Sequence, residues 1–458
     1  MNAFYVICGL GVFSLLAEIV NLKRWLIVFI TIGIAVAVGL AISDWNNTTH
    51  HFSDMVMFDN FTLAITALIC VLGVLWFWMG SEYFNDEAHL TDKASLVLFS
   101  IAGAIMMASF NNMAMLFLGI EILSISLYVL AGSRKDNLAS NEAAFKYFLM
   151  GSFATCFLLM GIALVYGATA SFNLTKIADY VADVSVYKPL PGFFYVGVLL
   201  VLVGMAFKVS AVPFHFWAPD VYEGSPTTIT AFMSTIVKVA AFAAFFKLFA
   251  FTFIGVKSSW LIVMQVITVL TLVIANVTAV YQNNVKRMLA YSSVGHAGYV
   301  LLGISSAGLS GMGTIFYYLT VYSFASLSAF AILHWEEGKG KDITVDHFNG
   351  MFKRKPFVAV AMTISLLSLA GIPPLAGFFG KYLVFAQALS HGYTGLVILA
   401  VCTSLIGVYY YFRIIIVMFM KEPSGEVVPV TGSMKIWMTV LIVLNLALGI
   451  FPDLISFF

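Results

Sequence analysis

Charged residues are scarce in this sequence of 458 residues. Asp, Glu, Lys and Arg together make up 10% of the chain, whereas hydrophobic residues make up 61%, and soluble proteins carry roughly 25% charged residues. So much apolar surface cannot be buried inside a soluble core, so we expect the lipid bilayer to be the solvent for most of it. The net charge is only +1. The chain therefore has no large excess of positive charge that would attract nucleic acid, and no nucleic-acid partner is expected.

Cysteine and nucleotide-binding motifs are equally sparse. The four cysteines lie in apolar runs without a CxxC pair or metal-type spacing: Cys8, Cys70, Cys156 and Cys402. We expect small buried hydrophobes here rather than a disulfide framework, a zinc site or an iron–sulfur cluster. The chain is therefore predicted to hold no metal or cofactor and to carry no electrons. No GxxxxGK[ST] motif occurs, so the sequence shows no nucleotide-binding site through which ATP could drive transport.

Long apolar segments recur along the whole chain. They predict an all-α integral membrane protein with about fourteen transmembrane helices, at 3–20, 24–42, 58–79, 94–110, 113–132, 144–167, 193–212, 227–250, 259–280, 287–306, 312–334, 357–388, 393–420 and 434–452. Basic residues follow the first segment rather than precede it, so we expect a retained helix and not a cleaved signal peptide. Most basic loop residues fall on alternate connections, which places both termini on the outer side of the cytoplasmic membrane.

Several ionisable side chains interrupt these segments. Glu121, Lys208, Lys238 and Lys381 lie too deep to reach the membrane surface, and each costs about 2.5–3.5 kcal/mol to insert. Burial disfavours their charged form and a neighbouring opposite charge favours it. Lysine can therefore exchange protons, whereas arginine stays protonated. We interpret the four as a proton relay; the alternative is a structural ion pair.

Other polar groups are weaker candidates. Lys146, Lys247 and Arg413 lie near segment ends, where snorkelling explains them at least as well. Lys146 remains a possible relay residue because its segment is expected to face that of Glu121. His215 and His296 are possible relay stations, although a hydrogen-bonded structural histidine is an equal alternative.

Proline pairs interrupt two segments, each beside a lysine. Pro213 and Pro219 follow Lys208, and Pro373 with Pro374 precede Lys381. Such breaks are typical of transporters built from inverted repeats, although kinks made only for packing are an alternative. We predict accessory helices at 1–90, two inverted five-helix repeats at 91–255 (Glu121, Lys208, Lys238) and 256–420 (Lys381), each with one broken helix, and a final helix at 421–458.

Three motifs carry a family resemblance over about residues 90–420. VPFHFWAPDVYEGSPT, NNVKRMLAYSSVGHAGY and SLAGIPPLAGFFGKYLVF resemble the antiporter-like membrane subunits of respiratory NADH–quinone oxidoreductase, complex I. The resemblance implies a proton-translocating chain whose partners are the lipid bilayer and the other membrane subunits of the complex. NADH, FMN, iron–sulfur clusters and quinone would then belong to other subunits.

The same resemblance assigns roles to the four deep residues. Glu121 and Lys208 would form the ion pair of the input half, with Lys238 as the central relay residue and Lys381 as the terminal lysine. The alternative is an Mrp-type or stand-alone cation/proton antiporter, which PFHFWAPDVYEG disfavours. An electron-carrying subunit would need redox ligands that the sequence lacks, and a passive scaffold would make the buried charges dispensable.

Overall fold

A computed structural model describes residues 1–19, 22–84, 89–187, 190–306, 308, 311–338, 343–423 and 430–455. Its chain is divided by internal packing into two compact units. The first unit comprises Met1–Val209 and Ile236–Met264, and the second comprises Ser210–Thr235 and Gln265–Phe458. Segment 210–235, which was expected in the first repeat, therefore packs within the second unit.

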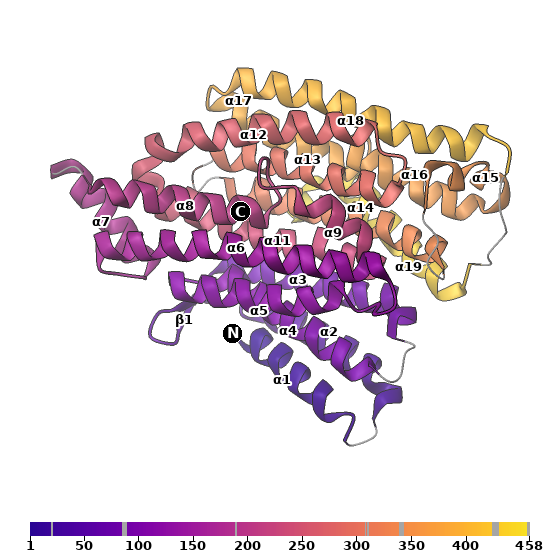
Figure 1. The fold of residues 1–458 in the computed structure, drawn as a ribbon, viewed down its shortest axis with the longest axis horizontal. Coiled ribbons are helices and arrows are strands. Elements are labelled where there is room, and N and C mark those ends of the chain that lie inside the picture. The colour runs from indigo at the N-terminus through magenta and orange to yellow at the C-terminus, as the bar shows by residue number, and fades with distance from the viewer. Residues whose placement is uncertain are drawn as a thin grey trace. The chain divides into compact units, whose positions relative to one another are not determined.

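Helices dominate the first unit (Figure 1). They are α1 (Asn2–Leu16), α2 (Lys23–Ser43), α3 (Asn60–Met79), α4 (Leu90–Ser109), α5 (Met113–Ala131), α6 (Leu138–Thr169), α7 (Leu174–Tyr187), α8 (Gly192–Lys208), α11 (Ile236–Phe246) and the start of α12 (Lys257–Val280), with short turns η1 (Gly80–Phe84), η2 (Lys247–Thr252) and η3 (Ile254–Val256). A hairpin joins β1 (Thr49–His51) to β2 (Val56–Phe58). A membrane favours helices because they satisfy their own backbone hydrogen bonds.

The second unit contains the remaining helices. They are α9 (Trp217–Gly224), α10 (Thr227–Ser234), the rest of α12, α13 (Val285–Ser306), α14 (Met312–Glu337), α15 (Met351–Arg354), α16 (Pro356–Ala370), α17 (Ala376–Ser390), α18 (Thr394–Met420) and α19 (Gly432–Ile450), with turns η5 (Val345–Phe348) and η6 (Pro452–Ile455). Helix α14 packs against α10, α16, α17 and α19, and its membrane-length stretch is buried.

The structure supports a multi-pass membrane protein. Within the described residues, ten helical stretches are long and apolar enough to cross a bilayer, and the shorter helices α1, α8 and α16 are also apolar. Each expected apolar segment contains at least one helix. Both proline-rich stretches separate two helices as predicted: α8 from α9, and α16 from α17.

Three features differ from the expectation. The segment expected at 227–250 is not one helix, because the backbone of Thr235 leaves helical geometry between α10 and α11. The connection expected to be polar at 168–192 contains α7, whose inward face is apolar. The loop before α3 forms the hairpin. Neither the interruption at Thr235 nor the hairpin carries a proline or glycine signal, so tertiary packing decides their conformation.

Candidate functional site

The first unit places Glu121 and Lys208 near enough to interact electrostatically, and the ion pair expected between them stays a prediction. Lys208 ends α8 and is 6% exposed, and its Nζ donates a hydrogen bond of 2.6 Å to the Ser124 Oγ of α5. Glu121 lies one helical turn before Ser124, is half-buried, and interacts electrostatically with Lys208. The hydroxyl of Thr155 on α6 donates to Glu121 Oε1 over 3.0 Å. Carboxylate and ammonium each have a hydroxyl partner of their own, Thr155 for Glu121 and Ser124 for Lys208.

Close packing of α6 against α8 places these groups (Figure 1). A Cβ atom at Gly161 of α6 would lie 2.7 Å from the Val201 backbone nitrogen, and one at Gly204 would lie 2.8 Å from Leu158 Cβ. Small residues at such positions let helix backbones approach in a membrane. The approach leaves a small cavity, in which the polar side chains of Ser124, Thr155 and Lys208 lie among mostly apolar neighbours.

Lys238 occupies a different part of the same unit. It lies in the first turn of α11, directly after the interruption at Thr235, and is 2% exposed. Sequence reasoning predicted its burial but placed it in an unbroken helix. The interruption gives this lysine a position at a helix junction, like the positions of Lys208 and Lys381.

The second unit holds Lys381 at the break between α16 and α17. Its Nζ donates to the Ala370 carbonyl over 2.7 Å and to Ser404 Oγ over 2.8 Å, and it lies 5.0 Å from the Tyr299 ring centre. Ala370 ends α16, so the ammonium caps a helix C-terminus, where positive charge is favoured. Gly371 has φ +82°, and a Cβ there would lie 2.8 Å from Lys381 Cδ. Glycine is therefore required by both conformation and space.

His296 is the centre of a hydroxyl network in the second unit. Its Nδ1 lies 2.7 Å from the Tyr318 hydroxyl and its Nε2 lies 3.3 Å from the Tyr411 hydroxyl, and Tyr411 also bonds to Ser292. The Tyr299 hydroxyl is buried near the polar side chains of Thr403, Ser404 and Asn276.

His215 contrasts with His296. Its ring is buried beside Phe216 and Tyr291. Its Nδ1 has no hydrogen-bond partner within the residues that the structure describes. The structure therefore gives His215 a buried place but no described hydrogen-bonded route to His296.

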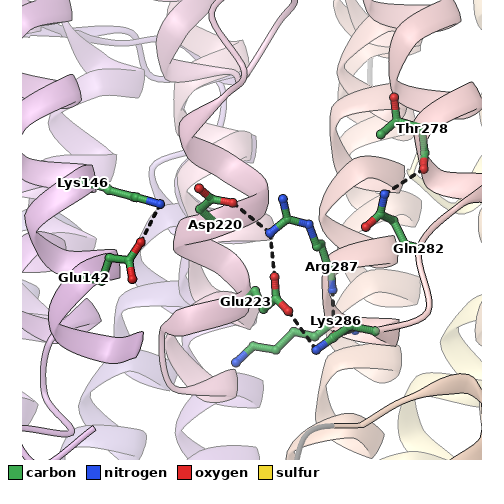
Figure 2. A network of polar contacts seen from close by, with 9 residues as sticks. Glu142, Lys146, Asp220, Glu223, Thr278, Gln282, Lys286 and Arg287 are labelled. Atoms are coloured by element: carbon green, nitrogen blue, oxygen red, sulfur yellow. Dashed lines mark hydrogen bonds and ion pairs between the residues drawn. The ribbon is translucent and has the colours of Figure 1, made fainter. Parts of the chain in front are cut away.

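The three cations near helix ends have separate explanations. Lys247 is buried and donates to the carbonyls of Ala108 and Phe110, each over 3.1 Å, at the end of α4. Arg413 donates to the carbonyls of Val280 and Gln282 at the end of α12. Helix capping therefore explains both better than snorkelling does. Lys146 is partly exposed and pairs with Glu142 over 2.7 Å (Figure 2).

Sequence reasoning missed a second set of charges, some buried and some half-buried, in the second unit. Arg287 bridges Asp220 and Glu223 over 2.8 and 2.6 Å (Figure 2), and Lys355 pairs with Glu336 over 3.0 Å in a buried position. Lys286 and Glu337 are buried as well. Lys286, Arg287 and Lys355 were assigned to loops or helix ends. In the sequence these three residues lie at segment boundaries. A boundary position does not by itself distinguish a buried side chain from an exposed one.

The described residues contain no group of three or more His, Cys, Asp or Glu side chains arranged to hold a metal ion. The fold and the site define a multi-pass helical membrane protein in which lysines are buried at helix junctions.

A family model described as NADH:quinone oxidoreductase/Mrp antiporter, TM, matches residues 110–407, and the chain belongs to this family. The NADH-quinone oxidoreductase subunit N of Cytophaga hutchinsonii is 43% identical over 99% of this chain and 98% of its own length. Its namesake from Flavobacterium psychrophilum is 40% identical over 99% of each chain.

Solved structures match the fold over nearly the whole length. A chain of respiratory complex I from Thermus thermophilus superposes with a TM-score of 0.85 at 31% identity, covering 99% of this chain and 98% of that chain. A chain of the Mrp complex from Dietzia sp. gives a TM-score of 0.87 at 20% identity, covering 100% of this chain and 96% of that one. The Mrp likeness concerns the fold alone.

Proposed function

We propose that this chain is a proton-translocating membrane-arm subunit of NADH–quinone oxidoreductase. The observation that carries the proposal is full-length similarity, at 43% identity, to a protein named as subunit N of that enzyme. The chain acts beside the other membrane subunits of the complex. NADH, FMN, iron–sulfur clusters and quinone are held by other subunits, and energy from their electron transfer drives charge movement in this one.

In this proposal the deep ionisable residues form the proton relay. A change in the distance between Glu121 and Lys208 alters how strongly that lysine holds its proton. The proton then moves to Lys238 and finally to Lys381. Support comes from the hydroxyl groups of Ser124 and Ser404, which accept hydrogen bonds from Lys208 and Lys381. Lys146, His215 and His296 are further candidates for the route.

The architecture that we propose has about fourteen transmembrane helices and two inverted repeats, at 91–255 and 256–420, with accessory helices at 1–90 and 421–458. Helix interruptions beside Lys208 and Lys381 support the repeats, because transporters with inverted repeats break corresponding helices near the bilayer midplane. Both termini lie on the outer side of the cytoplasmic membrane, since basic loop residues concentrate on the inner side.

Native purification tests this proposal. The chain is extracted from its own membranes in mild detergent, and the proteins that accompany it are identified from their peptides. We expect the other subunits of NADH–quinone oxidoreductase and NADH–quinone activity in the same fraction. Recovery with Mrp partners, or recovery of the chain alone, would contradict the proposal and favour the antiporter alternative.

A further inference from the structure

Tyr128 is a buried residue of the Glu121–Lys208 site to which the relay gives no role. It lies on α5, seven residues after Glu121 and four after Ser124, so these three side chains share one face of the helix. Tyr128 is 9% exposed, and it lines the same small cavity as Ser124 and Lys208. The site therefore contains a phenol whose buried hydroxyl needs a polar partner.

Helix α6 fixes the place of the Tyr128 hydroxyl. A Cβ atom at Gly151 would lie 2.1 Å from this hydroxyl oxygen and 2.9 Å from the ring atom Cζ, so no larger residue fits there while Tyr128 keeps its position. The ring also packs edge-on against Tyr147 and Phe148, with centroids 4.7 and 5.8 Å away. Both rings belong to α6, and their packing opposes any sideways movement of Tyr128. Glycine at position 151 thus makes room for the hydroxyl inside the site.

The Ser124 hydroxyl is the polar group that Tyr128 meets. Its hydrogen is donated to the Ile120 carbonyl of the same helix, and its oxygen accepts the Lys208 ammonium over 2.6 Å. A hydroxyl oxygen has two lone pairs, so one remains for a second donor. The Tyr128 hydroxyl lies within hydrogen-bonding range of Ser124 and supplies that donor. Together these partners hold the Ser124 hydroxyl in the orientation that accepts from a charged lysine.

The charge of Glu121 acts on Tyr128 as well. The two residues interact electrostatically, as Glu121 does with Lys208. Because a carboxylate attracts the hydrogen of a hydroxyl, a movement of Glu121, which the proposed relay requires, acts on the Tyr128 hydroxyl as well as on the lysine.

We propose that Tyr128 is a positioning residue of the Glu121–Lys208 site. Its hydroxyl, placed over Gly151, donates to Ser124 and holds the Ser124 hydroxyl as the acceptor for Lys208. Tyr128 thereby acts through Ser124 on how readily Lys208 releases its proton. This inference rests on the proposed function, because it assigns a further residue to the same relay.

A double-mutant cycle in the assembled complex, reconstituted into liposomes, tests this role. Tyr128→Phe removes the hydroxyl and keeps the ring, and Ser124→Ala removes the oxygen through which Tyr128 acts. We expect each variant to slow NADH–quinone turnover and proton uptake about fivefold, the factor to which one ordinary hydrogen bond corresponds. The double variant should be no slower than Ser124→Ala alone, because Tyr128 then has no partner left to orient.

Ser126 provides the matched control on the same helix. It is buried, and like Ser124 it donates to the carbonyl four residues earlier, that of Ile122. Ser126→Ala should keep the parental turnover, and Tyr128→Phe should keep its full fivefold effect when combined with it. A purely structural role of the Tyr128 hydroxyl would give the same additional loss in the Ser124→Ala and Ser126→Ala backgrounds.

A second variant displaces the hydroxyl without removing it. Gly151→Ala puts a Cβ atom where the Tyr128 hydroxyl lies, and it should slow turnover to a similar extent. Gly167→Ala on the same helix is its control, because a Cβ atom there would make only an ordinary contact of 3.8 Å with Phe193. Should Tyr128→Phe not assemble, this pair carries the test, and equal turnover in the two assembled variants would overturn the inference.

The outcomes separate this inference from the proposed function. Parental turnover in assembled Tyr128→Phe would overturn the inference, and so would a double variant slowed by the product of the two single effects, since Tyr128 would then act independently of Ser124. Lys208→Ala is measured alongside. If Lys208→Ala slows turnover while Tyr128→Phe does not, only the inference fails; if neither does, the proposed relay fails too.

Discussion

The buried lysines differ from one another in the groups that receive their hydrogen bonds. Lys208 donates to Ser124, and Lys381 donates to Ser404 and a backbone carbonyl, whereas Lys355 is held by the carboxylate of Glu336. A serine hydroxyl accepts a hydrogen bond from an ammonium and can donate one to a neutral amine. Lys208 and Lys381 therefore keep a partner in both protonation states, as a relay requires.

Replacing Lys381 by arginine separates charge from proton exchange. Arginine keeps the positive charge at the end of α16 but stays protonated, so the relay predicts that Lys381→Arg and Lys381→Ala both slow NADH–quinone turnover and proton uptake, by about tenfold. The measurement is turnover together with acidification of liposomes that contain the assembled complex. Parental activity in Lys381→Arg would show that only charge is needed at this position and would contradict the relay.

Glu121 is expected to act through its charge rather than its volume. Glu121→Gln preserves the hydrogen bond from Thr155 but removes the electrostatic interaction with Lys208, so we expect turnover and pumping to fall together. Thr155→Val is the control, because it removes the hydroxyl and leaves the carboxylate; a smaller effect is expected. An equal loss in both variants would indicate that geometry, not charge, matters at this site.

The sequence allowed the deep lysines to be predicted but not the boundary charges. Lys208, Lys238 and Lys381 lie in apolar runs that leave no way to the membrane surface, so their burial follows from position, whereas Glu121 in a similar run is only half-buried. Lys286 and Glu337 lie where helices end, and the same pattern fits a solvated loop. Their burial depends on the packing of α10, α13 and α14, which no local signal encodes.

At the scale of elements, interrupted helices bring the lysines to backbone groups. Residues 371–375 separate α16 from α17, and Lys381 of the second helix caps the first. Prolines and glycines predicted this break. The interruption at Thr235, in contrast, lies in the run FMSTIVKV, whose β-branched residues and lack of proline gave no sign of it. There the tertiary structure overrides local preference.

Two glycines with nearly the same backbone conformation test the break at Lys381. Gly371 has φ +82° and Gly392 has φ +83°, but only a Cβ at Gly371 would approach Lys381, at 2.8 Å, whereas Gly392 faces open space. Alanine at either position should cost about 1–2 kcal/mol of conformational energy. Only Gly371→Ala should also displace Lys381 and slow turnover. Thermal unfolding and NADH–quinone turnover of the assembled complex are the measurements, and equal turnover in both variants would contradict this role.

At the scale of the whole chain, the candidate residues are divided between the two compact units. Glu121, Lys208 and Lys238 belong to the first unit, and Lys381 with His296 belongs to the second. Each unit therefore carries its own ionisable groups and its own hydroxyl partners. The general class, a multi-pass helical membrane protein, followed from composition, whereas the division into units did not, because it depends on contacts between distant segments.

In the proposed relay, Lys238 receives the proton after Lys208 and passes it on before Lys381, so the proposal depends on this residue. The most direct test is proton translocation by the assembled complex carrying Lys238→Ala in liposomes, measured together with NADH–quinone turnover. We predict that both fall by about tenfold or more while the complex retains all its subunits. Parental proton translocation and turnover in a fully assembled Lys238→Ala complex would contradict the account.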